Sequence, residues 1–321
     1  MKKVLSICGI IASLFACEPG DFIDLPKGDK RVCILAFNEA GVPWTIVVSP
    51  TADLNELPLP EGLPDAKVTL YEDGKFLEVL ELDTLDPNLT PPRPLADRPS
   101  FFRSANNAPR PGREYKVVVE AEGYPVATAR YIQPLPVEAD ITFEFRERKY
   151  TPPIVFGAGD PPRDSIFTTT FDITIAFTDP EGENFYDFWG IQSQVQDVTQ
   201  STYYSAYYLA LPNYSPVNNE VWNGYMIDDH LISGQHVTYD FIMRFSTDFG
   251  PYRPLPEWFT VSLRTTTKEM YDYLIKTRKA GLTEYDPYAQ PIRSYTNVEN
   301  GLGIFGGFTP TSKQFHYKGV D

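Results

Sequence analysis

The chain has 321 residues, of which 42% are hydrophobic and 14% aromatic, and its formal net charge is −15. This length allows one large or two ordinary domains with buried cores, and the apolar content excludes a disordered chain. The charge argues against nucleic acid as a partner, because binding a phosphate backbone needs a basic surface.

The amino terminus has the pattern of a lipoprotein signal. Two lysines precede the apolar run 4–15, which is too short to span a bilayer as a helix. Ala16 and Cys17 follow and resemble the end of a bacterial lipobox, in which the cysteine is acylated. We therefore predict that residues 1–16 are removed, that acyl chains on Cys17 anchor the chain in a membrane and that residues 17–30 form an acidic tether. The alternative is an ordinary signal peptide that contains Cys17.

Residues 31–136 are predicted to form a first immunoglobulin-like β-sandwich, because short alternating apolar runs are separated by Pro, Gly, Asn and Asp. The Asp73-Gly74 pair predicts a tight hairpin. Residues 87–111 hold seven prolines, which cannot donate ladder hydrogen bonds, and are predicted to be an inserted loop. Cys33 lies in an apolar run and is expected to be a buried small side chain. The predicted strands are 32–37, 44–49, 67–72, 75–82, 114–122 and 125–132.

Residues 137–321 are predicted to form a second β-sandwich with one helix at 268–280. Thr266 and Glu269 have the spacing of a capping box, and Gly281 could cap the carboxyl end. We expect this helix to close one end of the sandwich. The predicted strands are 139–145, 171–179, 187–194, 201–211, 237–245 and 259–265.

The segment Gly301–Phe308 alternates glycine with apolar residues. No Lys-Ser/Thr pair and no helix follows it, so a phosphate-binding loop is not indicated. Glycines in this setting favour a strand that is bent or closely approached by another backbone. The chain has no Gly-x-Ser-x-Gly motif either, and we expect neither catalytic residues nor a cofactor.

One cluster of acidic residues and histidines could form a metal or acid–base site: Asp228, Asp229, His230 and His236. Its spacing fits no known metal motif, and the chain has only three histidines. A polar turn leading into the next strand explains the same residues, and this interpretation is preferred.

The densest aromatic patch comprises Tyr203, Tyr204, Tyr207, Tyr208 and Tyr214. In a strand, alternate tyrosines face opposite sides, so one pair would be displayed if the other were in the core. Displayed tyrosines are good platforms for a ligand or a protein partner. Ordinary packing within the sandwich is the alternative and is favoured by the frequency of Tyr in strands.

The chain resembles the Bacteroidetes lipoprotein family known as domain of unknown function 4249. The resemblance covers nearly the whole mature length and rests on short motifs in a common order. These motifs are the start at Cys17-Glu18, Asp24-Leu25-Pro26, residues 66–70 before the Asp73-Gly74 hairpin, residues 111–115, Phe177-Thr178-Asp179-Pro180, residues 268–274 and residues 297–306.

This resemblance implies an outer-membrane lipoprotein, often encoded beside a TonB-dependent transporter, without established catalytic residues. The acidic residues after Cys17 resemble a surface-export signal, so display at the cell surface is expected. The leading functional hypothesis is a non-catalytic accessory or ligand-capturing subunit of a TonB-dependent nutrient transporter. The alternatives are a surface adhesin or a structural component of an assembly complex and, least favoured, a secreted hydrolase.

Overall fold

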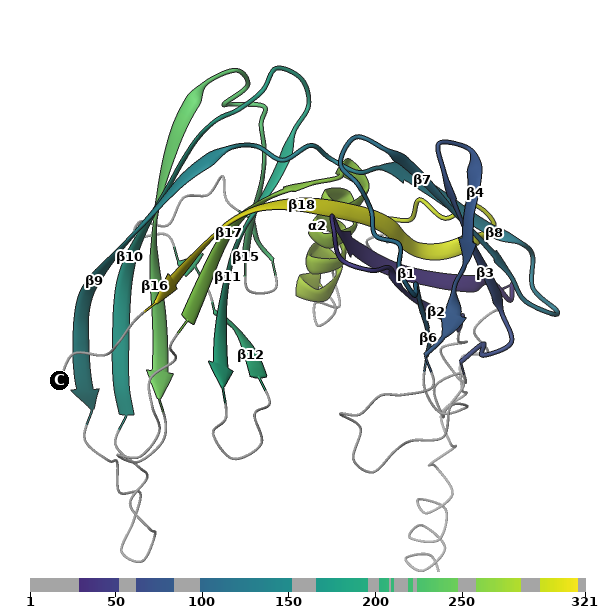
Figure 1. Cartoon of the computed structure of the whole chain (residues 1–321), viewed down its shortest axis with the longest axis horizontal. Coiled ribbons are helices and arrows are strands. Elements are labelled where there is room, and N and C mark those ends of the chain that lie inside the picture. Colours follow the sequence, from purple (N-terminus) through teal and green to yellow (C-terminus); the bar gives the residue numbers. More distant parts are fainter. Residues whose placement is uncertain are drawn as a thin grey trace, which may run out of the picture.

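A computed structural model describes residues 29–51, 62–83, 99–151, 166–195, 202–207, 209–210, 219–221, 224–247, 258–283 and 295–316. These residues form three β-sheets and one helix (Figure 1). The predicted mostly β fold of packed sheets is confirmed, whereas its likeness to immunoglobulin domains stays a prediction.

The first sandwich packs a four-stranded sheet against one end of a much larger sheet. The small sheet has the order β4-β3-β7-β8, and the facing strands are β1, β2, β6 and β5. The strand bounds are β1 Val32–Glu39, β2 Thr45–Pro50, β3 Lys67–Glu72, β4 Lys75–Val79, β5 Glu81–Leu82, β6 Ser100–Arg103, β7 Glu114–Glu120 and β8 Ala127–Ile132.

Two turns of the first sandwich show how local sequence sets its topology. Asp73 and Gly74 both have positive φ, as a two-residue hairpin requires, and they join β3 to β4 as predicted. The strand predicted over 75–82 is instead divided at Leu80, because the chain passes there from the small sheet to the large one. Leu80 is buried between the two sheets.

The second sandwich packs a sheet of order β13-β16-β10-β9 against the other end of the large sheet. Strand β9 ends six residues after its predicted last residue, and β10 begins five residues before its predicted first residue. Both additional segments are rich in Thr or charged residues and lack clear alternation. The bounds are β9 Ala139–Thr151, β10 Ile166–Thr178, β11 Phe185–Val195, β12 Thr202–Tyr207, β13 Leu209–Ala210, β14 Asn219–Val221, β15 Gly224–Asp228, β16 His236–Thr247, β17 Trp258–Thr266 and β18 Gly301–His316.

Strand β18 belongs to both sandwiches. Its first half pairs in parallel with β1, from Gly301 to Phe308, and its second half pairs antiparallel with β17, from Phe308 to His316. The large sheet is therefore continuous across both units (Figure 1). The expected boundary at residues 136/137 separates β8 from β9, but the first sandwich is completed by a strand that the sequence analysis assigned to the second unit.

Close approach to β18 explains its glycines. A Cβ atom on Gly303, where φ is +96°, would lie 2.0 Å from the carbonyl oxygen of Ile34 on β1. A Cβ atom on Gly307 would lie 2.5 Å from Oε1 of Gln133. The interpretation of this segment as a strand approached by another backbone is confirmed.

Each sandwich has its own aromatic core. Trp44 is fully buried in the first, where its ring stacks on Phe305 of β18 at 5.8 Å and meets Tyr115 edge-on at 4.8 Å. In the second, Phe171 and Phe259 lie in facing sheets with ring centroids 5.6 Å apart. Phe315 of β18 packs against this second core, so both halves of β18 contribute to a buried core.

The helix, α2 (Lys268–Thr283), begins at the predicted residue and ends three residues later than predicted, and its capping differs from the prediction. The hydroxyl of Thr267, and not that of Thr266, accepts a hydrogen bond from the backbone N–H of Met270 at 3.2 Å and so caps the helix. Gly281 lies inside the helix and does not cap it. Thr266 is instead the last residue of β17.

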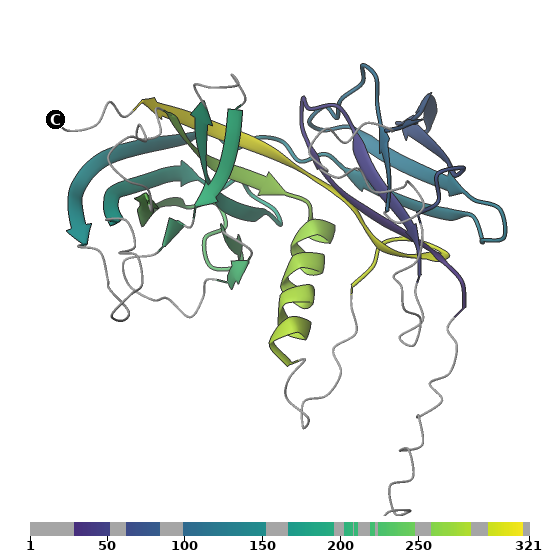
Figure 2. The same ribbon diagram turned by 90° about the horizontal axis from the view of Figure 1, so that it is seen from below.

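A third apolar cluster joins α2 to the outer face of the large sheet, where the two sandwiches meet. It comprises Phe185, Met226, Met270, Tyr271, Leu274, Ile275 and Phe308, with Phe37 and Tyr273 packed against it. Figure 2 shows α2 between the two units, beside the crossing strand β18. The helix was expected to close one end of a sandwich, but it covers this junction instead.

Replacing Gly303 by Ala should destabilise the protein more than replacing Gly41. Both glycines have positive φ, which costs an L-residue about 1–2 kcal/mol, but a Cβ atom on Gly41 would meet nothing within 4 Å. We expect Gly303→Ala to lower the free energy of unfolding in urea by about 3 kcal/mol, because the clash with β1 adds to the strain. Equal losses for the two variants would contradict the close contact between β18 and β1.

Candidate functional site

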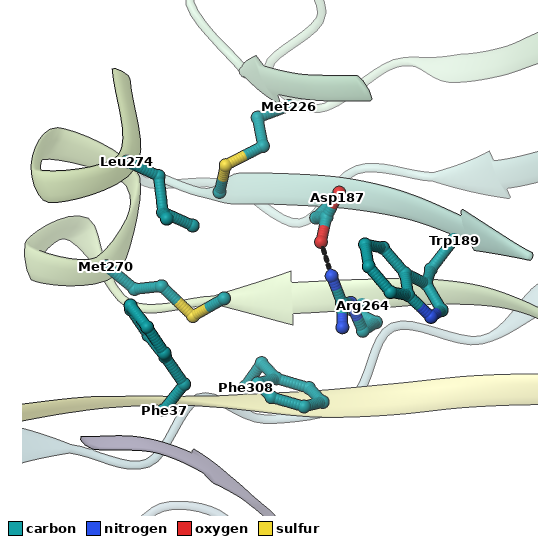
Figure 3. Close-up of a pocket in the computed structure, with 8 residues that line it drawn as sticks. All are labelled: Phe37, Asp187, Trp189, Met226, Arg264, Met270, Leu274 and Phe308. Atoms are coloured by element: carbon teal, nitrogen blue, oxygen red, sulfur yellow. Dashed lines mark hydrogen bonds and ion pairs between the residues drawn. The ribbon is translucent and has the colours of Figure 1, made fainter. Parts of the chain in front are cut away.

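A small pocket of about 180 Å³ lies under α2 at the junction of the two sandwiches (Figure 3). Strands β1, β11, β15, β17 and β18 contribute to it, and the helix forms one wall. Its described lining residues are Phe37, Asp187, Trp189, Met226, Arg264, Met270, Leu274 and Phe308. The lining is apolar except for one carboxylate and one guanidinium group.

Strand register explains how the polar groups meet. Met226, Asp187 and Arg264 are paired neighbours on β15, β11 and β17, so they form one row across the sheet. Because side chains alternate along a strand, Asp187 and Trp189 share this outer face, while Tyr186 and Phe188 of the same strand enter the core of the second sandwich. The outer face is therefore charged and aromatic at the same time.

Arg264 is the central group of the site. Its Nη2 atom donates a hydrogen bond to Asp187, and the two side chains are 13% and 3% exposed. The guanidinium carbon lies 4.2 Å from the ring centre of Trp189 and 4.6 Å from that of Phe308. Burial lowers the pKa of Arg264 to about 9, an effect that the nearby Glu39 opposes, so the group carries its charge at neutral pH.

Most of the N–H donors of the Arg264 guanidinium group have no hydrogen-bond partner among the described residues. It carries five N–H groups, and Asp187 is its one hydrogen-bond partner among the described residues. Its Nε atom is buried without a partner in that part of the structure. Glu39 is paired in the strand register with Phe308; burial raises the pKa of Glu39, while the charge of Arg264 acts to lower it. Arg264 is thus in contact with one carboxylate, that of Asp187, and is influenced electrostatically by a second, that of Glu39.

Asp228, at the end of β15, holds helix α2 against the sheet and so positions the wall of the pocket that the helix forms. Its carboxylate accepts a hydrogen bond from the hydroxyl of Tyr271 on α2 at 3.1 Å and another from the ring of His230. Partial burial raises the pKa of Asp228, but these two hydrogen bonds outweigh that effect and the pKa is lowered overall. Lys268 lies 4.9 Å from the ring centre of Phe185 and adds a second contact between helix and sheet.

The structure supports the turn interpretation of Asp228, Asp229, His230 and His236. The buried Asp229 carboxylate accepts a hydrogen bond from the backbone N–H of Asn184 at 2.8 Å, which ties this turn to the start of β11. The ring of His236 bonds to Thr178, its neighbour on β10, and so does not join the other three. Within the described ranges, no three His, Cys, Asp or Glu residues are grouped to hold a metal ion.

The predicted tyrosine patch lies only partly within the described residues. Tyr203, Tyr204 and Tyr207 belong to β12, which pairs with β11, whereas Tyr208 and Tyr214 lie outside the described residues. A role for this patch stays a prediction.

The predicted lipid attachment point, Cys17, also lies outside the described residues. Among the described residues, no helix is long and apolar enough to cross a membrane.

The sequence contains a signal for the pocket that is not among the predicted site residues. Asp187 stands between Phe185 and Trp189 on the same face of its strand, and Arg264 is the only charged residue of β17. One opposite charge in each of two apolar strands indicates a buried ion pair, because an unpaired charge is costly to bury.

Comparisons with known proteins identify the family alone. A family model described as Domain of unknown function (DUF4249) matches residues 21–314. Comparison with curated proteins found no match, and neither did comparison with solved structures. The matched range includes every lining residue of the pocket.

Neutralising Asp187 should be far more costly than neutralising a surface partner. In Asp187→Asn the buried guanidinium of Arg264 loses its counter-charge, and we expect a loss of about 3 kcal/mol in the free energy of unfolding. Glu183 pairs with Lys268 in the open, so Glu183→Gln should change stability by less than about 0.5 kcal/mol. Urea denaturation of both variants checks this, and a small effect at Asp187 would be inconsistent with a buried pair.

Stability should depend on the ionisation of Asp228 at low pH. In the folded protein the pKa of Asp228 lies below its ordinary value of 3.8. Ionised Asp228 therefore contributes its full stabilisation above about pH 4, and this stabilisation is lost as the pH falls through the pKa of the folded protein. The difference in unfolding free energy between the wild type and Asp228→Asn should therefore shrink below about pH 4. Tyr271→Phe removes one of the two hydrogen bonds and should reduce this pH dependence. A difference that is equal at pH 3 and pH 5 would rule out the linkage.

Proposed function

The chain belongs to the DUF4249 family, and we propose that it is an outer-membrane lipoprotein that serves as a non-catalytic, ligand-capturing or accessory subunit of a TonB-dependent nutrient transporter. The observation that carries this proposal is the junction pocket. It combines apolar walls with a buried guanidinium group, which is the composition of a binding site that orients a ligand by a few polar contacts.

The polar groups of the pocket favour binding over catalysis. Its lining carboxylate, Asp187, is engaged by Arg264, and that cation is held between two aromatic rings. A general base needs a free acceptor within reach of its substrate, and an ion-paired carboxylate is a poor one. Neither residue is therefore assigned a catalytic role.

The predicted anchor explains how such a subunit would stay near a transporter. Acyl chains on Cys17 would hold the chain at the outer membrane, at the cell surface in the proposed orientation. Residues 18–31 can span at most about 50 Å before the first strand begins at Val32. Confinement within that distance raises the effective concentration beside a membrane partner, so that a weak contact suffices.

Copurification tests this proposal. The native lipoprotein and a Cys17→Ser variant are extracted with mild detergent, and the recovered partners are identified by mass spectrometry. We expect a TonB-dependent transporter with the wild type, and we expect the variant to leave the membrane fraction and lose that partner. Repeated recovery of the wild type without any transporter would contradict the proposal and favour the adhesin or assembly-component alternative.

A further inference from the structure

We propose that the junction pocket binds a small uncharged molecule with a single aromatic ring and one oxygen atom that accepts a hydrogen bond from Arg264. This inference rests on the proposed ligand-capturing role and names the chemistry of the ligand. The volume of the pocket suits a molecule of this size. The pocket measures about 180 Å³, and an apolar cavity of about 150 Å³ accommodates benzene.

The walls suit a flat ring. The rings of Phe37 and Phe308 line the cavity, together with the flexible thioether side chains of Met226 and Met270 (Figure 3). Methionine adapts its shape to the ligand and makes favourable sulfur–aromatic contacts. Burying a ring among these residues removes apolar surface from water, which supplies most of the binding free energy.

The Arg264 guanidinium group defines the polar part of the ligand. One of its five N–H donors reaches Asp187, its faces are covered by Trp189 and Phe308, and its Nε atom is buried without a partner in the described structure. Because the Nε atom has no accessible surface, a ligand in the pocket would meet the terminal nitrogens Nη1 and Nη2, of which Nη2 bonds to Asp187. A donor left unpaired is costly, so an acceptor oxygen of the ligand beside these nitrogens would recover that free energy. Asp187 cannot serve all the donors, because it approaches from one side of the guanidinium group (Figure 3).

Charge balance disfavours an anionic ligand. Asp187 already neutralises Arg264 in a buried ion pair, and the half-buried Glu39 adds a second negative charge near the same cation. A ligand carboxylate would be repelled by both, whereas a ketone, amide or hydroxyl oxygen accepts a hydrogen bond without adding charge.

Three probe molecules separate these features. Acetophenone has the ring and a neutral acceptor, isopropylbenzene has the same shape without an acceptor, and benzoate carries a charge. Titration calorimetry on the full chain should show binding of acetophenone, with isopropylbenzene about tenfold weaker for the loss of one hydrogen bond to a charged group. Benzoate should bind more weakly than acetophenone. Equal affinity for acetophenone and isopropylbenzene, or binding of none of the three, would overturn the inference.

Variants locate the binding. Leu274→Trp fills the pocket and should abolish acetophenone binding, whereas Leu302→Trp makes the same change at a side chain that is 41% exposed and should leave it unchanged. If Leu274→Trp fails to fold, the double variant Asp187→Leu/Arg264→Met keeps the site apolar and should lose the preference for acetophenone. Binding that survives a folded Leu274→Trp, or a preference that survives the double variant, would place the ligand elsewhere. These results leave the copurification test unaffected, so each proposal can fail independently.

Discussion

The structure depends on one strand that is hydrogen-bonded to a different neighbour along each half of its length. Strand β18 pairs with β1 as far as Phe308 and with β17 from Phe308 onward, so two sandwiches share a single sheet. Such a crossing requires neighbouring groups to approach the strand closely on several sides. Gly303 and Gly307 permit this, because a Cβ atom at either position would overlap a group packed against β18.

The pocket is a consequence of that crossing. The outer face of the sheet near Phe308 needs a cover, and α2 supplies it directly after β17 ends. Helix α2 does not cover this face completely. The Asp187–Arg264 ion pair lies next to Met226 in one row across the sheet, and it interrupts the apolar surface that the helix packs against. Burying this pair costs desolvation free energy, and its position beside an apolar cluster therefore favours a binding role over a purely structural one.

Local sequence patterns predicted most elements but not the contacts between distant ones. Alternation predicted most of the strands, and Asp73-Gly74 predicted its hairpin, because these features depend on near neighbours. Strands β6, β14 and β15 were not predicted, and β6 lies within residues 87–111, which were expected to form a loop. The parallel pairing of β1 with β18 has no local signature, since it joins opposite ends of the described chain. The partners Asp187 and Arg264 are 77 residues apart, and the sequence indicates their pairing only by placing one opposite charge in each of two apolar strands.

Hydrogen exchange of the native protein tests most directly whether β18 unites the two sandwiches. Backbone amides of β1 and β17 that bond to β18 should exchange through openings of similar free energy, because β18 cannot leave one neighbour without disturbing its contacts with the other. Fast exchange in β1 while β17 remains protected would contradict the account, since it would show that the first sandwich opens independently of the shared strand.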